Sequence, residues 1–290
     1  MKNNLTKIES DSFKKYDFLE KLSGIIPPVE SIYIKGEIPK NKTCVAIVGT
    51  RKASAYGEKT AYDFSFTLAK NGFLIISGLA IGIDTSAHRG AVDAGGQTVA
   101  VLANGLDKIY PASNNQLADK IISNNGCLIS EYPPQTPSFP GNFLMRNRII
   151  SALSSAVIVI EAPFKSGSMT TAKFATEQKK PIFVVPGTIG SFNFNGSHKL
   201  IRSGARLITG VNDFLSDMSY DLIREENKKI ELKTDEQKIF NELKKSSRPL
   251  SVDKICQITK LNPRDVSCAL SNLLLEELVF QEGTNYQIKL

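Results

Sequence analysis

The fold of this chain is decided by the stretch TCVAIVGTR, residues 43–51, in which a run of small and apolar residues ends in a glycine turn. Such a run, with little polar alternation, is typical of a strand that is covered on both faces, as in a parallel sheet. Similar runs follow along the chain between turn residues. Together they predict these strands: Thr43–Val48, Phe73–Ser77, Thr98–Leu102, Cys127–Ser130, Ala156–Ile160, Ile182–Val185 and Ala205–Ile208.

Amphipathic stretches separate these apolar runs. They predict helices at Tyr56–Asn71, Asp84–Ala94, Asn114–Asn124, Phe143–Leu153, Thr170–Lys179 and Ser197–Ser203. Strands that alternate with helices indicate βαβ units and a parallel sheet. We therefore expect an α/β fold over residues 40–219, with a Rossmann-like, doubly wound and mostly parallel sheet.

The flanks of this domain have a different character. Residues 1–39 form a lead-in segment that is punctuated by Pro27-Pro28, and residues 220–233 form a charged linker with little to bury. Residues 234–290 show three helical stretches, followed by two short strands around a turn that contains glycine. This order is typical of a winged helix, so we expect a small C-terminal winged-helix domain.

Positive charge is concentrated in the predicted α/β domain. The chain of 290 residues carries 36 Lys or Arg against 29 Asp or Glu, a formal net charge of +7. Residues 1–39 and residues 220–290 are each neutral, so the whole excess lies between Lys40 and Ser219. A localised excess indicates an anionic partner at that domain, although basic surfaces also serve solubility alone.

Several protein classes are disfavoured. The N-terminal residues carry scattered charges and lack the apolar stretch of a secretory signal, and no apolar run approaches the roughly 20 residues that span a bilayer. The four cysteines stand far apart, and the two histidines have no partners at ligand spacing. We therefore expect a cytoplasmic protein with no membrane partner, no metal site and no disulfide framework.

The loops that follow the predicted strands are rich in Gly, Ser, Thr and basic residues. They read GTRKAS at 49–54, SGLAIGID at 77–84, NG at 104–105, KSGS at 165–168 and PGT at 186–188. The carboxyl ends of parallel strands meet at one edge of the sheet, where ligands bind. Small residues and helix N-termini expose N–H groups to phosphate oxygens, and Arg51 adds a forked donor. We therefore expect phosphate binding at this edge.

A second cationic segment reads FPGNFLMRNRIIS, residues 139–151. On a helix, Arg146 and Arg148 point about 200° apart, so they cannot serve one task. One of them would reach the ligand edge while the other ties the helix to a neighbouring loop; an internal salt bridge is the alternative. Phe139 and Phe143 would either stack on bases or belong to the core.

Five motifs, in order along the chain, carry a resemblance to a known family. They are VGTR at 48–51, SGLAIGIDTSAH at 77–88, RNRII at 146–150, KSGSMTTA at 165–172 and VPG at 185–187. They resemble the successive signatures of the bacterial DNA-processing family usually called DprA or Smf. The resemblance covers residues 16–205, and the C-terminal winged-helix pattern is similar to the tail of that family.

The resemblance implies a non-enzymatic protein, without a cofactor, that binds single-stranded DNA entering by natural transformation. It also implies a homodimer that hands this DNA to the recombinase RecA and displaces single-strand binding protein. By the motif match, Arg51 and Lys165 would contact phosphates, and Arg146 and Arg148 would line or brace the same pocket. The full set of expected DNA- or phosphate-binding residues is Gly49, Arg51, Lys52, Gly78, Gly82, Phe143, Arg146, Arg148, Lys165, Ser166, Gly167 and Ser168.

Two features depart from the pattern of this family. His198 stands where the family usually has Asn in the segment GSHKLIRSGA, residues 196–205, which puts a shared hydrogen bond at this loop in doubt. The N-terminal helical extension of many members is expected to be absent or much shortened, so its function is not carried over.

Four other functions can be compared with parts of the sequence. A nucleotide phosphoribohydrolase would need a carboxylate where Thr171 stands, and Asp84 is better explained as a helix N-cap. A dinucleotide-binding protein would show Gly-x-Gly-x-x-Gly and an ATPase a Walker-type loop, and the chain has neither. A winged helix that reads duplex DNA would concentrate Lys and Arg, whereas residues 231–290 hold nine residues of each sign. We expect a regulatory or protein-contact role for this domain.

Overall fold

The computed structural model describes residues 5–40, 42–218, 234–246, 248–275 and 278–288 of the chain. The chain divides into two compact units, Met1–Phe214 and Leu215–Leu290. The expected charged linker, residues 220–233, lies outside the described residues, so the domain limits next to it stay predictions. Among the described helices, none has the length and apolar character needed to cross a bilayer.

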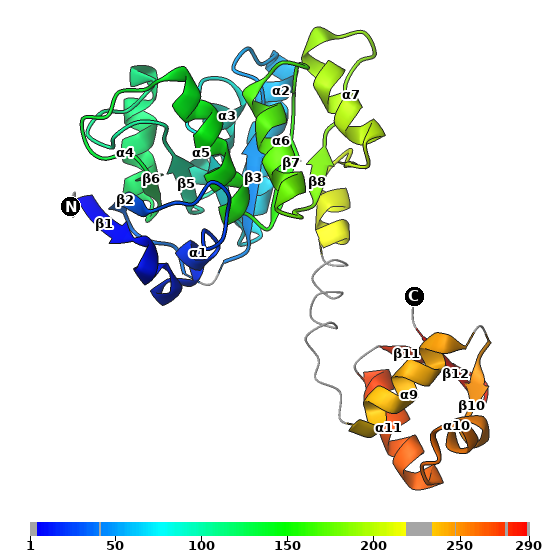
Figure 1. Cartoon of the computed structure of the whole chain (residues 1–290). Coiled ribbons are helices and arrows are strands. Elements are labelled where there is room, and N and C mark those ends of the chain that lie inside the picture. The colour runs from blue at the N-terminus through cyan, green and yellow to red at the C-terminus, as the bar shows by residue number, and fades with distance from the viewer. Residues whose placement is uncertain (1–4, 41, 219–233, 247, 276–277, 289–290) are drawn as a thin grey trace. The chain divides into compact units, whose positions relative to one another are not determined.

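The first unit is built on one nine-stranded sheet (Figure 1), with the strand order β1-β2-β6-β5-β4-β3-β7-β8-β9. The seven neighbouring strands β6-β5-β4-β3-β7-β8-β9 pair in parallel, as predicted. Their bounds are β3 Cys44–Val48, β4 Leu74–Ser77, β5 Thr98–Val101, β6 Cys127–Ser130, β7 Ala156–Val159, β8 Ile182–Val184 and β9 Arg206–Leu207. Every residue of β3 to β7 is buried, which explains their unbroken apolar runs.

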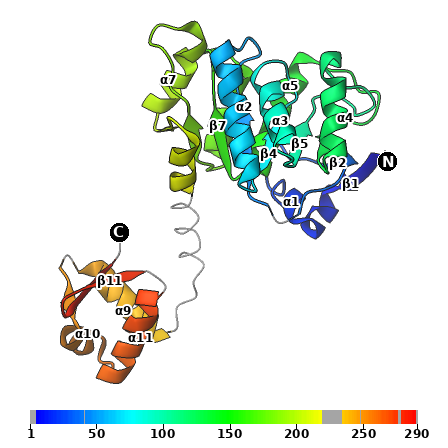
Figure 2. The same cartoon turned by 180° about the vertical axis from the view of Figure 1, so that it is seen from behind.

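Helices cover both faces of this sheet, α2, α3 and α4 on the face turned to the viewer in Figure 2, and α5 and α6 on the face seen in Figure 1. Their bounds, with that of α7, are α2 Ala55–Lys70, α3 Ile83–Asp93, α4 Asn115–Ser123, α5 Pro140–Leu153, α6 Gly167–Glu177 and α7 Asn195–Arg202. The chain winds from β3 towards β6 and later from β7 towards β9, so β3 and β7 are neighbours where the winding reverses. The predicted doubly wound fold is confirmed, and ligands of such folds bind at this switch point.

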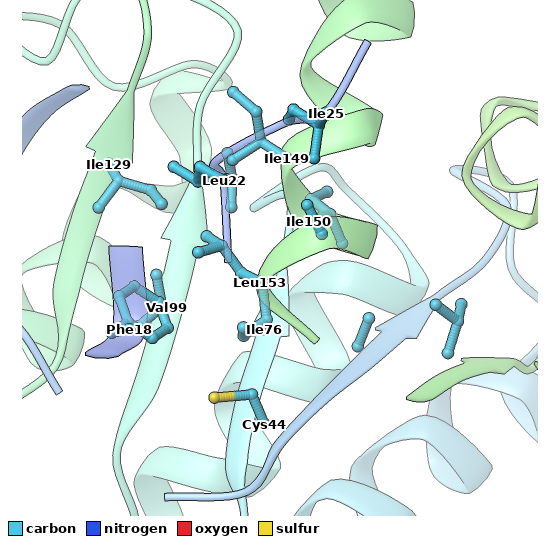
Figure 3. Packing of buried hydrophobic residues seen from close by; sticks show 14 of the residues in the cluster. Phe18, Leu22, Ile25, Cys44, Ile76, Val99, Ile129, Ile149, Ile150 and Leu153 are labelled. Atoms are coloured by element: carbon cyan, nitrogen blue, oxygen red, sulfur yellow. The ribbon is translucent and has the colours of Figure 1, made fainter. Parts of the chain in front are cut away.

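The N-terminal segment, which we expected to be only a lead-in, is part of the same sheet. β1 (Leu5–Glu9) and β2 (Ser31–Gly36) pair antiparallel, and β2 pairs antiparallel with β6. The helices between them are η1 Ser10–Lys15 and α1 Asp17–Glu20. Phe18 and Leu22 belong to the same buried cluster as Leu153 of α5 (Figure 3). β2 alternates between buried and half-buried positions, so it lacks the unbroken apolar run by which the central strands were predicted.

The second unit has a hydrophobic core of its own. Its elements are α9 Thr234–Lys245, β10 Leu250–Ser251, α10 Val252–Thr259, α11 Pro263–Leu275, β11 Val279–Glu282 and β12 Asn285–Ile288. The strands form an antiparallel sheet in the order β10-β12-β11, and Ile239, Ile255 and Leu270 are among the buried residues beneath it. Three helices and a hairpin confirm the predicted winged helix. β10 was not predicted, because two residues are too short to show a pattern.

Candidate functional site

A pocket of about 880 Å³ lies at the switch point between β3 and β7. Most of its wall comes from the loop after β3, from the loop after β7 with the first turn of α6, and from α5. Nine of the twelve expected site residues line it, namely Gly49, Arg51, Lys52, Phe143, Arg146, Lys165, Ser166, Gly167 and Ser168. The fold therefore gathers residues from three separate motifs around one cavity.

One part of the wall combines positive charge with aromatic rings. The guanidinium carbon of Arg51 lies 4.5 Å from the centroid of the Phe143 ring. The ring of Tyr110 also packs against Phe143, and the centroids of these two rings are 5.5 Å apart. Lys52 and Lys165 are exposed and line the same pocket. A ligand in the pocket meets cations and π faces together, a combination suited to a negatively charged molecule with flat rings.

A second part of the wall is the N-terminus of α6. Ser166 occupies the N-cap position, but its side chain does not cap the main-chain N–H groups of the helix; its hydroxyl lies 2.8 Å from the hydroxyl of Ser168. The side-chain amide of Asn147 on α5 donates to the carbonyl oxygen of Gly167 at 3.0 Å, which holds this loop against α5. Gly167 and Ser168, the first residues of α6, therefore line the pocket at a helix N-terminus that has no side-chain cap, as an anion site requires.

Arg146 forms the floor of the pocket and is almost fully buried. Its guanidinium donates to the main-chain oxygens of Gly78 at 2.7 Å and of Val101, and its Nε donates to Oδ1 of Asn147 at 3.2 Å. Burial lowers the pKa of Arg146 to about 10, an effect that the nearby carboxylate of Asp84 opposes. At neutral pH the guanidinium is therefore charged, and it holds the ends of β4 and β5 together beneath the pocket.

Arg148 does not line the pocket, so its place among the expected DNA-binding residues is corrected; it takes the second role expected of the arginine pair, which is to tie the helix to neighbouring loops. Its side chain is 2% exposed and pairs with the carboxylate of Glu131, with N–O distances of 2.8 and 2.6 Å. It also donates to the main-chain oxygens of Pro27 and Pro28 at 2.9 and 3.2 Å. Because positions two apart on a helix point about 200° apart, only Arg146 faces the ligand edge. Arg148 instead fastens the N-terminal segment to α5.

Gly78 and Gly82 are not among the residues that line the pocket, and their expected role as DNA contacts stays a prediction. A Cβ at Gly78 would lie 2.3 Å from a guanidinium nitrogen of Arg146. Gly82 has a φ of +82°, and a Cβ there would lie 2.6 Å from the main-chain oxygen of Thr50. Both positions therefore require glycine so that neighbouring groups of the site can approach the turn after β4.

A buried carboxylate beside the pocket was not predicted. Glu161, just after β7, is fully buried and accepts hydrogen bonds from the Ser54 amide at 3.0 Å, from the Ser54 hydroxyl, and from the Asn193 amide group at 3.1 Å. Asn193 also donates to the main-chain oxygen of Lys52 at 3.0 Å. These bonds tie the loop after β3 to the segment after β8. The only sequence signal for them is one acidic residue that ends the apolar run of β7.

Asp84 and His198, whose roles were open, both brace loops at this edge. Asp84 lies in the first turn of α3 and accepts from the N–H groups of Gly78 at 3.2 Å and Ala80 at 3.4 Å, so it holds the preceding loop and is not the expected N-cap. Burial raises the pKa of Asp84, while the charge of nearby Arg146 lowers it. His198 donates from Nε2 to the main-chain oxygen of Gly187 at 3.0 Å, so a hydrogen bond is present although the usual Asn is not.

No metal centre was expected, and among the described residues no group of three or more His, Cys, Asp or Glu side chains is placed to hold a metal ion. Cys44 and Cys127 are buried, Cys256 is half-buried and Cys268 is exposed, all as free thiols. Burial raises the pKa of both Cys44 and Cys127, which keeps these thiols protonated and unreactive at neutral pH.

The family described as DNA recombination-mediator protein A has a model that matches residues 11–219 of the chain. The chain belongs to this family. A second model, described as the DprA winged helix domain, matches residues 224–283. The family that the five motifs resemble is thereby confirmed, together with the C-terminal winged helix.

Curated relatives of this DprA-family chain share about two fifths of its residues. The chain is 42% identical over 193 residues to Protein Smf of Escherichia coli (strain K12). The aligned region covers 66% of this chain and 52% of the E. coli protein. The chain is 39% identical over 210 residues to the DNA processing protein DprA of Bacillus subtilis (strain 168). Here the aligned region covers 71% of this chain and 69% of the B. subtilis protein. The chain thus spans about half the length of the E. coli protein.

Two solved DprA structures are similar to this DprA-family chain. The X-ray structure of DprA from Streptococcus pneumoniae superposes with a TM-score of 0.66 at 36% identity, covering 73% of this chain and 74% of the other. DprA from Helicobacter pylori superposes with a TM-score of 0.66 at 30% identity, covering 76% of this chain and 98% of the other. The latter structure is described by its single-stranded DNA binding mode, which is a property of the H. pylori protein.

Proposed function

We propose that this chain binds single-stranded DNA, without sequence preference, in the pocket between β3 and β7. The observation that carries the proposal is the convergence of Arg51, Phe143 and the uncapped N-terminus of α6 on one cavity. Arginine, lysine and helix N–H groups bind phosphate oxygens, whatever the base. Aromatic faces accept any base by stacking, and they reach only bases that are not already stacked in a duplex. The same geometry therefore supports a preference for single strands.

We further propose that the bound strand is passed to RecA, by a homodimer that also displaces single-strand binding protein, in the cytoplasm. What supports this step is membership of the DNA recombination-mediator family and the matching description of its relatives as DNA processing proteins. The test is RecA-dependent strand exchange on DNA that is already coated with single-strand binding protein. We expect the chain to shorten the lag before exchange, and an unchanged lag would contradict this part of the proposal.

An enzyme of the phosphoribohydrolase type is the alternative. Against it, Thr171 stands in the pocket wall at the position where such enzymes carry a carboxylate. The carboxylate that does line this wall, that of Asp84, is already engaged by main-chain N–H groups. Incubation with AMP and related nucleotides, followed by detection of free base, separates the two functions. We expect no release above the background rate.

The central experiment compares single-stranded and double-stranded oligonucleotides by mobility shift across a range of salt concentrations. We expect tighter binding of the single strand, equal affinity for different sequences, and an affinity that falls steeply as salt rises. If the purified protein does not bind oligo-dT at low salt, the proposal is wrong.

A further inference from the structure

Positive charge extends from the pocket onto α7. Between Ala162 and Asn212 the sequence has seven Lys or Arg and a single acidic residue, Glu177. That one carboxylate lies 3.7 Å from the ammonium of Lys173 in an i, i+4 pair on α6. Almost all of the +7 net charge of the chain therefore falls in this segment, which begins at the pocket and continues beyond it.

The start of α7 is fastened to the strand end that forms the pocket. The N–H groups of Gly196 and Ser197 donate to the carbonyl oxygen of Ala162 at 2.8 and 3.1 Å, and the N–H of Ala162 donates to the Ser197 hydroxyl at 3.1 Å. The next residues of that strand end are Pro163 and Phe164, followed by Lys165 of the pocket wall. The hydrogen bonds between Ala162 and the start of α7 thus bring the next turn of the helix, which carries Lys199, next to Phe164.

Phe164 and α7 form a cationic aromatic surface next to the pocket. The Phe164 side chain is 53% exposed, although both of its chain neighbours line the pocket. The ammonium of Lys199 lies 4.6 Å from the centroid of the Phe164 ring. Arg202 is exposed and three residues beyond Lys199, so both cations share one side of the helix. An exposed ring with cations beside it repeats the Arg51–Phe143 arrangement inside the pocket.

We propose that Phe164, Lys199 and Arg202 form a second subsite for the same DNA strand, where a base stacks on Phe164 and its phosphates lie against the two cations. The inference rests on the proposed single-stranded DNA binding and adds the direction in which the strand leaves the pocket. Continuity with the pocket and charge complementarity favour a nucleic acid here. A protein surface covering the same face is the competing occupant that the experiment must distinguish.

The test uses the full chain, two oligo-dT lengths of about 6 and about 20 nucleotides, and the variants Phe164→Ala and Lys199→Gln. We expect Phe164→Ala to weaken binding of the longer oligonucleotide by about tenfold and to leave the shorter one at the wild-type affinity. Lys199→Gln should make the salt dependence shallower by about one unit of slope for the longer oligonucleotide only. The matched control is Lys70→Gln, which removes a similar cation lying 5.8 Å from the Phe66 ring at the far end of α2.

The outcomes separate this inference from the function on which it rests. If the wild-type chain binds neither oligonucleotide, the proposed function fails and the subsite with it. If the wild type binds both but Phe164→Ala weakens both equally, or neither, the second subsite is refuted while the pocket stands. If Phe164→Ala changes the oligomeric state in analytical ultracentrifugation and leaves DNA binding unchanged, the face belongs to a protein contact and the inference is overturned.

Discussion

The guanidinium of Arg51 lies over the ring of Phe143, with 4.5 Å between its central carbon and the ring centroid. The two residues come from the loop after β3 and from α5, and only the fold brings them together. Phe143 orients the cation before any ligand binds, so less side-chain entropy is lost on binding. The ring of Tyr110 also packs against Phe143, with 5.5 Å between the two centroids.

Replacing Arg51 tests this arrangement. We expect Arg51→Ala to weaken single-stranded DNA binding by about tenfold for every sequence, and to make the salt dependence shallower by about one unit of slope. Arg51→Lys should keep the salt slope but not the full affinity, because an ammonium cannot reproduce a flat guanidinium on a ring. The measurement is fluorescence anisotropy across salt concentrations. Lys59→Ala, an exposed cation on α2 paired with Asp63, is the control that should change nothing.

Removing Arg148 should affect stability and not binding. Arg148→Ala leaves the partly buried carboxylate of Glu131 without its partner, and we expect the free energy of unfolding to fall by about 3–5 kcal/mol. Urea unfolding measures this change. Binding by the folded fraction should match the wild type, because Arg148 faces away from the pocket. A stable variant with lost DNA affinity would return Arg148 to the binding site.

Asn193 should control how firmly the Arg51–Lys52 loop is held. Asn193→Ala removes hydrogen bonds to the Lys52 main chain and to the buried carboxylate of Glu161, so we expect a loss of about 1–3 kcal/mol in unfolding free energy. The Ser54 amide, which donates to Glu161, should exchange its hydrogen faster than in the wild type. Asn195→Ala, at a neighbouring exposed position, is the control. Unchanged exchange at Ser54 would mean that this network does not restrain the loop.

His88 gives the chain a pH-dependent stability. Its Nδ1 lies 2.8 Å from the Thr98 hydroxyl, and that hydroxyl donates to the main-chain oxygen of Ile75. Burial, with a smaller effect of the Arg146 charge, lowers the pKa of His88 from 6.5 to about 3. Between these two pH values the unfolded chain binds a proton that the folded chain does not. This contribution to stability therefore rises with pH from about 3 to 6.5 and levels off above.

The variant His88→Gln isolates this effect. We expect the wild type to lose about 2 kcal/mol of unfolding free energy through His88 between pH 7 and pH 5, and the variant to lack that part of the decrease. Urea unfolding at a series of pH values measures the difference between the two proteins, so other titrating groups cancel. Parallel pH profiles would show that His88 is not the group responsible.

Deleting the winged helix, residues 234–290, should spare most of the DNA affinity. The winged helix has its own buried core, so its removal leaves the core of the α/β unit intact. A domain that binds duplex DNA by releasing counterions usually gathers Lys and Arg on its surface. Residues 231–290 carry equal numbers of basic and acidic residues, so this domain lacks that feature. Mobility shift with the shortened chain is the measurement. A loss of most of the affinity would make the winged helix a main DNA contact.

Local patterns were sufficient for most of the architecture. The central strands are visible in the sequence because both of their faces are buried, so their apolar runs need no knowledge of the partner strand. The loops of the ligand edge were predicted because parallel strands deliver their carboxyl ends to one side. β1 and β2 were missed, because most of their residues are exposed or half-buried, so they lack the unbroken apolar runs by which the central strands were predicted.

The amino-acid sequence alone determined the doubly wound fold, the winged helix and the edge at which the site lies, since these follow from periodicities within short segments. Only the tertiary structure decided which of Arg146 and Arg148 faces the pocket. Helical geometry separates the two side chains, but the packing of α5 on the sheet selects between them. The Glu161–Asn193 contact was likewise decided by the tertiary structure. A hydrogen bond between segments far apart in the chain leaves no periodic signal in either one.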